Sequence, residues 1–158
     1  MTTWAIVVAA GSGSRFGGAK QMQLLGDRRV LDWSLGAAAK IADGVVVVTA
    51  EGATATVESD LGVADAQVVV VRGGETRSAS VRAGLAAVPA DADVIVVHDS
   101  ARPLATPRLF ELVVDAVRDG ADAAIPAIAV VDTIRRRSGG VVDRDDLVAV
   151  QTLSLIHI

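Results

Sequence analysis

The chain has 158 residues, a length that supports one domain around one hydrophobic core. Hydrophobic residues make up 51% of it, and a mean hydropathy of +0.47 argues against a disordered chain. The net charge of −4 argues against a nucleic-acid-binding surface, and because the chain has no cysteine and only two histidines, any metal must be held by oxygen. Because no uncharged apolar run is long enough to span a bilayer and no basic leader precedes the first strand, we expect a cytoplasmic protein with no membrane partner.

Valine-rich blocks of four apolar residues predict strands at residues 5–8, 45–48, 68–71 and 94–97. Continuous apolar runs of this length are typical of parallel strands that are covered on both faces. Helix-period segments follow the strands at 31–40, 54–61 and 77–87. The fourth helix has the clearest limits, with Thr106 as N-cap, Pro107 as its first residue, and Asp119 and Gly120 as its stop. The alternation predicts an α/β, Rossmann-like, open and mostly parallel sheet with helices on both faces.

The pattern changes after residue 120. Residues 123–131 form a longer β-rich run that is interrupted by Pro126, and three arginines follow at 135–137. Gly139 and Gly140 then precede two valines. We interpret this region as a β arm, a hairpin that leaves the main sheet and turns at the two glycines.

The stretch from residue 7 to residue 21 has the composition of a phosphate-binding turn. Its glycines allow backbone amides to approach an anion, and Arg15 and Lys20 lie in a segment, 11–20, that contains no acidic residue. The stretch does not end in Gly-Lys-Ser/Thr, and Phe16 stands where a dinucleotide-binding motif has its third glycine. A nucleotide phosphate is the ligand it favours, and a glycine-rich turn with two solvated cations is the alternative.

Three later segments extend the pattern: Gly-Gly-Glu-Thr-Arg-Ser-Ala-Ser-Val at 73–81, Val-His-Asp-Ser-Ala-Arg-Pro at 97–103, and Val-Asp-Thr-Ile at 131–134. With the Ala-Ala-Gly-x-Gly-x-Arg of residues 9–15 and the Lys-Gln of residues 20–21, the chain resembles the nucleotidyltransferases. Among them it is most similar to the 2-C-methyl-D-erythritol 4-phosphate cytidylyltransferase family of the non-mevalonate isoprenoid pathway. The resemblance implies transfer of CMP from CTP to 2-C-methyl-D-erythritol 4-phosphate with release of pyrophosphate, in a homodimer joined by the β arm.

The resemblance also implies a role for individual residues. Arg15 and Lys20 would be catalytic, neutralising charge as the substrate oxygen attacks the α-phosphorus. CTP would contact residues from three loops: Ala9, Ala10, Gly11, Ser12, Gly13, Gly74, Glu75, Ser80 and Ser100. Asp99 would hold Mg²⁺ or another divalent cation against the triphosphate. The polyol phosphate would contact Arg102, Asp132, Thr133, Arg144 and Thr152, partly across the dimer interface.

The chain departs from the family at three places. Ala19 stands where the family usually has proline, and Glu75 stands where it often has aspartate. After Thr152 the family continues with Pro-Gln and more of the catalytic domain, whereas this chain ends in Leu-Ser-Leu-Ile-His-Ile. We therefore expect a nucleotidyltransferase domain at 1–152 that is incomplete at its C-terminus, and an artefact tail at 153–158 outside the fold. The activity expected is that of the intact parent protein.

The residues alone leave other interpretations open. Gly73 and Gly74 also fit a plain strand-to-helix turn with Ser80 on a helix surface, and Asp99 could pair with Arg102. His98, a lone histidine at a strand end, is given no catalytic role. A cytidylyltransferase acting on ribitol phosphate, a dinucleotide-binding Rossmann domain and a non-enzymatic interaction fragment are the competing functions.

Overall fold

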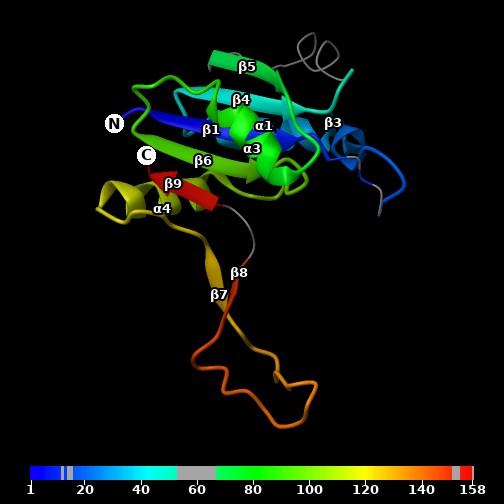
Figure 1. Cartoon of the computed structure of the whole chain (residues 1–158), viewed down its shortest axis with the longest axis vertical. Helices are drawn as coiled ribbons and strands as arrows, with labels where there is room; N and C mark the ends of the chain where they lie inside the picture. Colours follow the sequence, from blue (N-terminus) through cyan, green and yellow to red (C-terminus); the bar gives the residue numbers. More distant parts are fainter. Residues whose placement is uncertain (12, 14–15, 53–66, 151–153, 158) are drawn as a thin grey trace.

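The computed structural model describes residues 1–11, 13, 16–52, 67–150 and 154–157, the last of these by backbone alone. A five-stranded sheet with the order β5-β4-β1-β6-β9 forms its centre (Figure 1). Four strands are parallel: β1 (Thr3–Ala9), β4 (Gly44–Thr49), β5 (Gln67–Arg72) and β6 (Val94–Asp99). Each contains one of the predicted valine-rich blocks, so the predicted strands and fold class are confirmed.

Helices cover both faces of this sheet. On one face Ala5 and Val7 pack with α1 (Val30–Ala38) and α4 (Pro107–Arg118), and on the other Ile6 packs with α3 (Arg77–Leu85). The central strands are buried along nearly their whole length, while β5 at the edge is only half-buried. Burial on both faces explains why these strands are continuous valine runs and not alternating ones.

The predicted helices are confirmed where the structure describes them. The hydroxyl of Thr106 accepts a hydrogen bond from the Leu109 amide at 3.4 Å, and Pro107 is the first residue of α4. Val81 and Leu85 of α3 pack against the sheet, as their spacing predicts. The helix predicted at 54–61 lies outside the described residues. No helix in the described ranges is both long and apolar enough to cross a bilayer.

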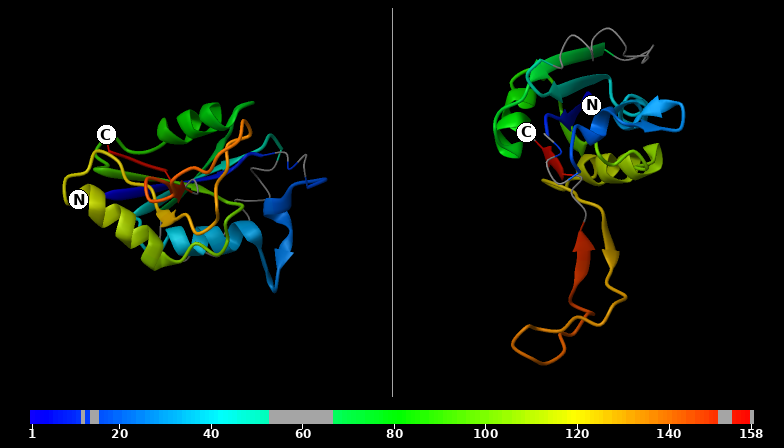
Figure 2. Two further views of the ribbon diagram at one scale, coloured as in Figure 1. Left: turned by 90° about the horizontal axis from the view of Figure 1, so that it is seen from below. Right: turned by 90° about the vertical axis from the view of Figure 1, so that its right-hand side faces the viewer.

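The β arm is also present. Strands β7 (Ala127–Ala129) and β8 (Val148–Val150) pair antiparallel and lead away from the sheet, and the right-hand view of Figure 2 shows the arm apart from the main body. Gly139 and Gly140 have φ values of +104° and +82°, a backbone conformation that glycine adopts readily. The turn therefore falls where the sequence places it.

Four short elements were not predicted. The 3₁₀ helix η1 (Lys20–Met22) leads into a small hairpin of β2 (Leu24–Leu25) and β3 (Arg28–Arg29). Strand β9 (Ser154–His157) pairs antiparallel with β6, although the sequence led us to place this segment outside the fold. The backbone gives the reason, because β6 has a second edge whose N–H and C=O groups accept a partner strand.

Candidate active site

A cavity of about 890 Å³ opens where the loops after β1 and β6 face the start of α3. Most of the predicted nucleotide and metal residues line it, together with the predicted substrate residue Arg102: Ala10, Gly11, Gly13, Lys20, Gly74, Glu75, Ser80, Asp99, Ser100 and Arg102. These residues come from four separate stretches of chain that meet at the carboxyl edge of the sheet. Ligands of open α/β sheets bind at this edge.

Two features shape the loop after β1. The carbonyl oxygen of Gly13 accepts hydrogen bonds from the amides of Phe16 at 2.7 Å and of Gly17 at 3.0 Å. A Cβ at Gly13, whose φ is +64°, would overlap the carbonyl oxygen of Gly18. Only glycine fits this position, so the motif glycine is a requirement of the backbone. The predicted residues Ser12 and Arg15 lie outside the described residues.

Gln21 is a residue whose importance the sequence reasoning missed. Its side chain is 7% exposed, and its Nε2 donates to the carbonyl oxygens of Ala9 at 2.8 Å and Gly11 at 3.0 Å. One amide thus ties the start of the loop to η1, on which Lys20 is carried. Ala9 is buried at the end of β1 and contributes its carbonyl to this contact. The sequence does contain a signal for this role, because Gln21 directly follows the motif residue Lys20.

The loop after β5 packs directly on the loop after β1. A Cβ at Gly73 would lie 2.5 Å from the Cβ of Ala10 and 2.8 Å from the Oγ of Ser80. The Ser80 hydroxyl is buried, and it both accepts from the Gly74 amide and donates to the Gly74 carbonyl, at 3.2 Å each. Ser80 therefore shapes this loop and is not a helix-surface residue. Its contact with a nucleobase stays a prediction.

Asp99 ends β6 between two guanidinium groups. Arg77 places Nε 3.0 Å from Oδ1, and Arg102 places Nε 3.5 Å from Oδ2. The next residue is Ser100, whose amide donates a hydrogen bond to the carbonyl oxygen of Val8. The carbonyl oxygen of Ser100 accepts one from the Ser34 hydroxyl at 2.8 Å. Both of these guanidinium groups are cationic, and the sequence reasoning had given Arg77 no role.

The donor set around Asp99 fits one kind of metal ion. No group of three or more His, Cys, Asp or Glu side chains is positioned to hold a metal within the described residues. Mg²⁺ is bound in nucleotide sites by one or two carboxylates, with waters and phosphate oxygens as its other ligands. Asp99, as one carboxylate at the wall of this cavity, suits a magnesium ion that arrives with a triphosphate, and it does not suit a site built from protein alone.

His98, the neighbour of Asp99, is a core residue. Its side chain is fully buried, and its ring packs edge-on against Phe110 with centroids 5.0 Å apart. Neither ring nitrogen has a hydrogen-bond partner among the residues that the structure describes. Burial lowers the pKa of His98 from 6.5 to about 4, so the imidazole is neutral near pH 7.

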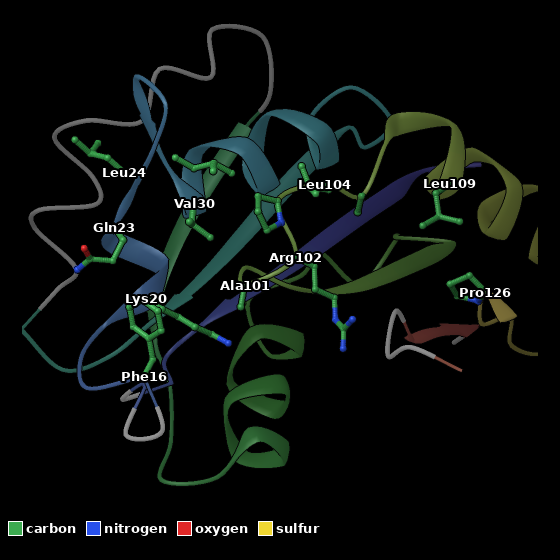
Figure 3. Close-up of a pocket in the computed structure, with 13 residues that line it drawn as sticks. Phe16, Lys20, Gln23, Leu24, Val30, Ala101, Arg102, Leu104, Leu109 and Pro126 are labelled. Atoms are coloured by element: carbon green, nitrogen blue, oxygen red, sulfur yellow. The ribbon is translucent and has the colours of Figure 1, made fainter. Parts of the chain in front are cut away.

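A second cavity, of about 800 Å³, adjoins the first (Figure 3). The two share Lys20, Ala101 and Arg102. The remaining walls of the second cavity are mostly apolar, and include Phe16, Leu24, Leu25, Val30, Leu104, Leu109 and Pro126. Lys20 and Arg102 therefore stand at the boundary between a polar and an apolar compartment.

Three of the four remaining predicted substrate residues do not line either cavity of this chain. Asp132, Thr133 and Arg144 lie in the β arm, and Nη1 of Arg144 donates to the Val131 carbonyl at 2.8 Å. The arm extends away from its own sheet (Figure 2). Thr152 lies outside the described residues.

The family model described as "IspD: 2-C-methyl-D-erythritol 4-phosphate cytidylyltransferase" matches residues 3–156. The chain belongs to this cytidylyltransferase family. The resemblance inferred from the motifs is therefore confirmed, and the match covers the parallel sheet, both cavities and the arm.

Individual relatives agree with this assignment. A bifunctional enzyme IspD/IspF of Clavibacter michiganensis is 41% identical over 160 residues, which cover 93% of this chain and 39% of the relative. A 2-C-methyl-D-erythritol 4-phosphate cytidylyltransferase of Streptomyces avermitilis is 41% identical over 145 residues, covering 85% of this chain and 57% of the relative. The chain thus spans between about two fifths and three fifths of the length of these curated relatives.

Solved structures show the same fold. The 4-diphosphocytidyl-2C-methyl-D-erythritol synthase of Anaerococcus prevotii superposes with a TM-score of 0.84 at 28% identity, covering 99% of this chain and 70% of that one. The 2-C-methyl-D-erythritol 4-phosphate cytidylyltransferase of Thermus thermophilus superposes with a TM-score of 0.78 at 32% identity, covering 99% of this chain and 71% of that one.

Proposed function

We propose that the chain is the catalytic part of an enzyme that transfers CMP from CTP to 2-C-methyl-D-erythritol 4-phosphate. The observation that carries the proposal is the cavity at the carboxyl edge of the sheet, which is lined by glycine backbone together with Lys20 and Asp99. The names of the relatives in the same family supply the substrate. A phosphate oxygen of the methylerythritol phosphate attacks the α-phosphorus of CTP, the bond from that phosphorus to the bridging oxygen breaks, and pyrophosphate leaves.

The chain's own residues stabilise charge in this reaction. The attacking phosphate oxygen is already anionic near neutral pH, so no side chain has to remove a proton. What the reaction needs is positioning and neutralisation of the charge that gathers around the α-phosphorus. Lys20 supplies a point charge at the boundary of the two cavities. The family resemblance assigns a second cation to Arg15, which lies outside the described residues.

Selection of the base falls to the loop after β5. We assign cytosine recognition to the backbone of Gly74 and to Glu75, with Ser80 holding Gly74 in place. Backbone donors and acceptors that are fixed in this way discriminate well, because a wrong base leaves buried polar groups unpaired. The adjoining backbone of residues 9–13 holds the triphosphate.

Asp99 is the residue that we propose for a divalent cation. Mg²⁺, when bound, would neutralise part of the negative charge of the triphosphate. Asp99 would hold the ion with one carboxylate oxygen, directly or through a water. Arg77 and Arg102 each contact one oxygen of this carboxylate at the wall of the cavity.

A second copy of the chain completes the site in this proposal. The arm exposes apolar side chains, among them Ile128 at 67%, Val131 at 80% and Val148 at 63%. Such a surface is typical of an interface. In a homodimer the arm carries Asp132, Thr133 and Arg144 to the partner's cavity, where Arg144 grips the substrate phosphate bidentately. Because CTP is drawn from the nucleotide pool of the cytoplasm, we place the enzyme there.

Two measurements test the function. Thermal unfolding with CTP, ATP, GTP or NAD, each with Mg²⁺, should show selective stabilisation by CTP, since a ligand of the native state raises the unfolding midpoint. Stabilisation by NAD, or by none of the four, would contradict the proposal. Pyrophosphate release with CTP and a panel of polyol phosphates then identifies the acceptor, and faster release with ribitol phosphate would overturn the choice of substrate.

Two variants test the assigned roles. Lys20→Ala should lower kcat much more than it weakens CTP binding, because a transition-state contact is lost. Arg144→Ala should raise the KM for the polyol phosphate and leave CTP affinity unchanged. A CTP-binding defect in Arg144→Ala would show that the arm serves a different site.

A further inference from the structure

Arg77 occupies a position that its own helix disfavours. It is the first residue of α3, directly after Thr76, whose hydroxyl caps the helix by accepting from the Ala79 amide at 3.1 Å. A helix N-terminus carries partial positive charge, so a cation there is unfavourable. The first turn of α3 contains no acidic residue to offset it. Nothing in the formation of α3 therefore calls for arginine at this position.

The reason for the arginine lies across the cavity. Arg77 follows β5, and Asp99 is the last residue of β6. In the sheet, β4 and β1 lie between β5 and β6. The Arg77 side chain nevertheless reaches Asp99, with Nε 3.0 Å from Oδ1. The pair joins two walls of the cavity above the carboxyl ends of the strands between them.

The two arginines hold different oxygens of the same carboxylate. Arg77 is on Oδ1 and Arg102 is on Oδ2, at 3.5 Å. The Asp99 side chain is 22% exposed, compared with 48% for Arg77 and 36% for Arg102, so the anion is the best shielded of the three groups. A carboxylate with one guanidinium on each oxygen has its plane fixed. The contact on Oδ1 is the one that comes from α3, and its loss would remove that restraint on the carboxylate while the contact with Arg102 remains.

We propose that Arg77 is a positioning residue that holds Asp99 in the orientation needed for the metal-bound triphosphate. The inference rests on the proposed function, because it assigns Asp99 to the divalent cation. Three cations and two carboxylates line the cavity, so an anionic ligand is still attracted when Asp99 is paired. Arg77 acts through Asp99 and needs no contact of its own with the nucleotide.

Calorimetric titration with CTP plus Mg²⁺, and separately with CMP, tests the proposal without measuring turnover. Arg77→Ala should weaken binding of CTP with Mg²⁺ by about tenfold, the size expected for one lost interaction with a charged group. Binding of CMP, which lacks the β- and γ-phosphates, should change by less than about twofold. Arg82→Ala is the matched control, because Arg82 is an exposed arginine on the same helix and does not line the cavity. It should leave both affinities unchanged.

The same titration in an Asp99→Asn background isolates the route of the effect. There, Arg77→Ala should change the affinity for CTP with Mg²⁺ by less than about twofold, because the carboxylate that it positions is gone. A loss that persists in this background would show that Arg77 contacts the phosphates directly and would overturn the proposal. Equal losses for CMP and CTP would also overturn it, since they indicate a general structural role.

Arg77→Lys separates position from charge. Lysine keeps the cation but lacks the guanidinium fork, so it should recover only part of the lost affinity. Full recovery would show that charge alone is needed, which contradicts a positioning role. A wild-type chain that does not bind CTP at all would instead refute the proposed function, so the two failures are distinguishable.

Discussion

Replacing Gln21 by methionine tests whether one buried amide organises the phosphate loop. The side chains have similar length, but methionine cannot donate to the carbonyl oxygens of Ala9 and Gly11. Each lost hydrogen bond is worth about 0.5–1.5 kcal/mol, so the free energy of unfolding should fall by about 2 kcal/mol. For a chain of this size that loss corresponds to a midpoint lower by about 4–8 °C. Gln21→Glu should be worse, because it places a carboxylate against two carbonyl oxygens.

The functional effect of Gln21→Met should exceed its effect on stability. A misplacement of about 1 Å in a catalytic group can lower a rate by the order of 100-fold, and Lys20 is carried by the same short η1 helix as Gln21. Differential scanning fluorimetry and the rate of pyrophosphate release from CTP measure the two effects. Gln67→Met is a suitable control, because Gln67 is an exposed glutamine at the start of β5. If Gln21→Met unfolds within about 1 °C of the wild type and releases pyrophosphate at the wild-type rate, the amide does not organise the loop.

Three further predictions concern packing, assembly and pH. Gly36→Ala in α1 should stabilise the chain by about 0.5–1 kcal/mol, because a Cβ there meets nothing within 4 Å. Gly84→Ala in α3 should destabilise it by about 1–3 kcal/mol, because its Cβ would lie 2.6 Å from Cγ2 of Ile6, and urea titration showing the reverse order would refute the packing argument. Ile128→Lys on the arm should give a monomer in analytical ultracentrifugation, whereas the control Leu112→Lys on the exposed side of α4 should not, and the opposite result would place the interface elsewhere. The pKa of His98 is lowered to about 4 in the folded chain, so between about pH 4 and pH 6.5 the unfolded chain binds a proton that the folded chain does not. The free energy of unfolding, measured without divalent cations, should therefore rise with pH across that window. Urea titrations at pH 4.5 and pH 7.5 measure the rise, which should be smaller by up to about 3 kcal/mol in the His98→Leu variant. An unchanged rise would show that other groups cause it.

The elements that the sequence predicts well are those whose signals are local. The limits of α4 follow from Thr106 and Pro107 at one end and Asp119 at the other, all within the segment itself. The parallel strands follow from valine runs that only burial on both faces explains. The motif residues could be placed near one another because carboxyl ends of parallel strands share an edge.

The contacts that the sequence did not predict join distant positions. Arg77 and Asp99 are separated by 22 residues, and no local pattern indicates that their side chains meet. The amide of Gln21 reaches back 12 residues to Ala9. The pairing of β9 with β6 depends on an open strand edge that is visible only once the sheet is assembled. Such contacts need the three-dimensional arrangement of the elements.

These long-range contacts connect the loops of the cavity to one another. Gln21 joins the loop after β1 to η1, Gly73 allows that loop to touch the loop after β5, and Arg77 joins the start of α3 to Asp99. Each contact restrains a loop that packs against the next loop. The effects of substitutions at any two of these contacts on the free energy of unfolding should therefore be non-additive, as is usual for groups in one network. The arm shares none of these contacts in the described residues. In the proposed function, the nucleotide part of the site is therefore one unit within a chain, and the acceptor part depends separately on what the arm contacts.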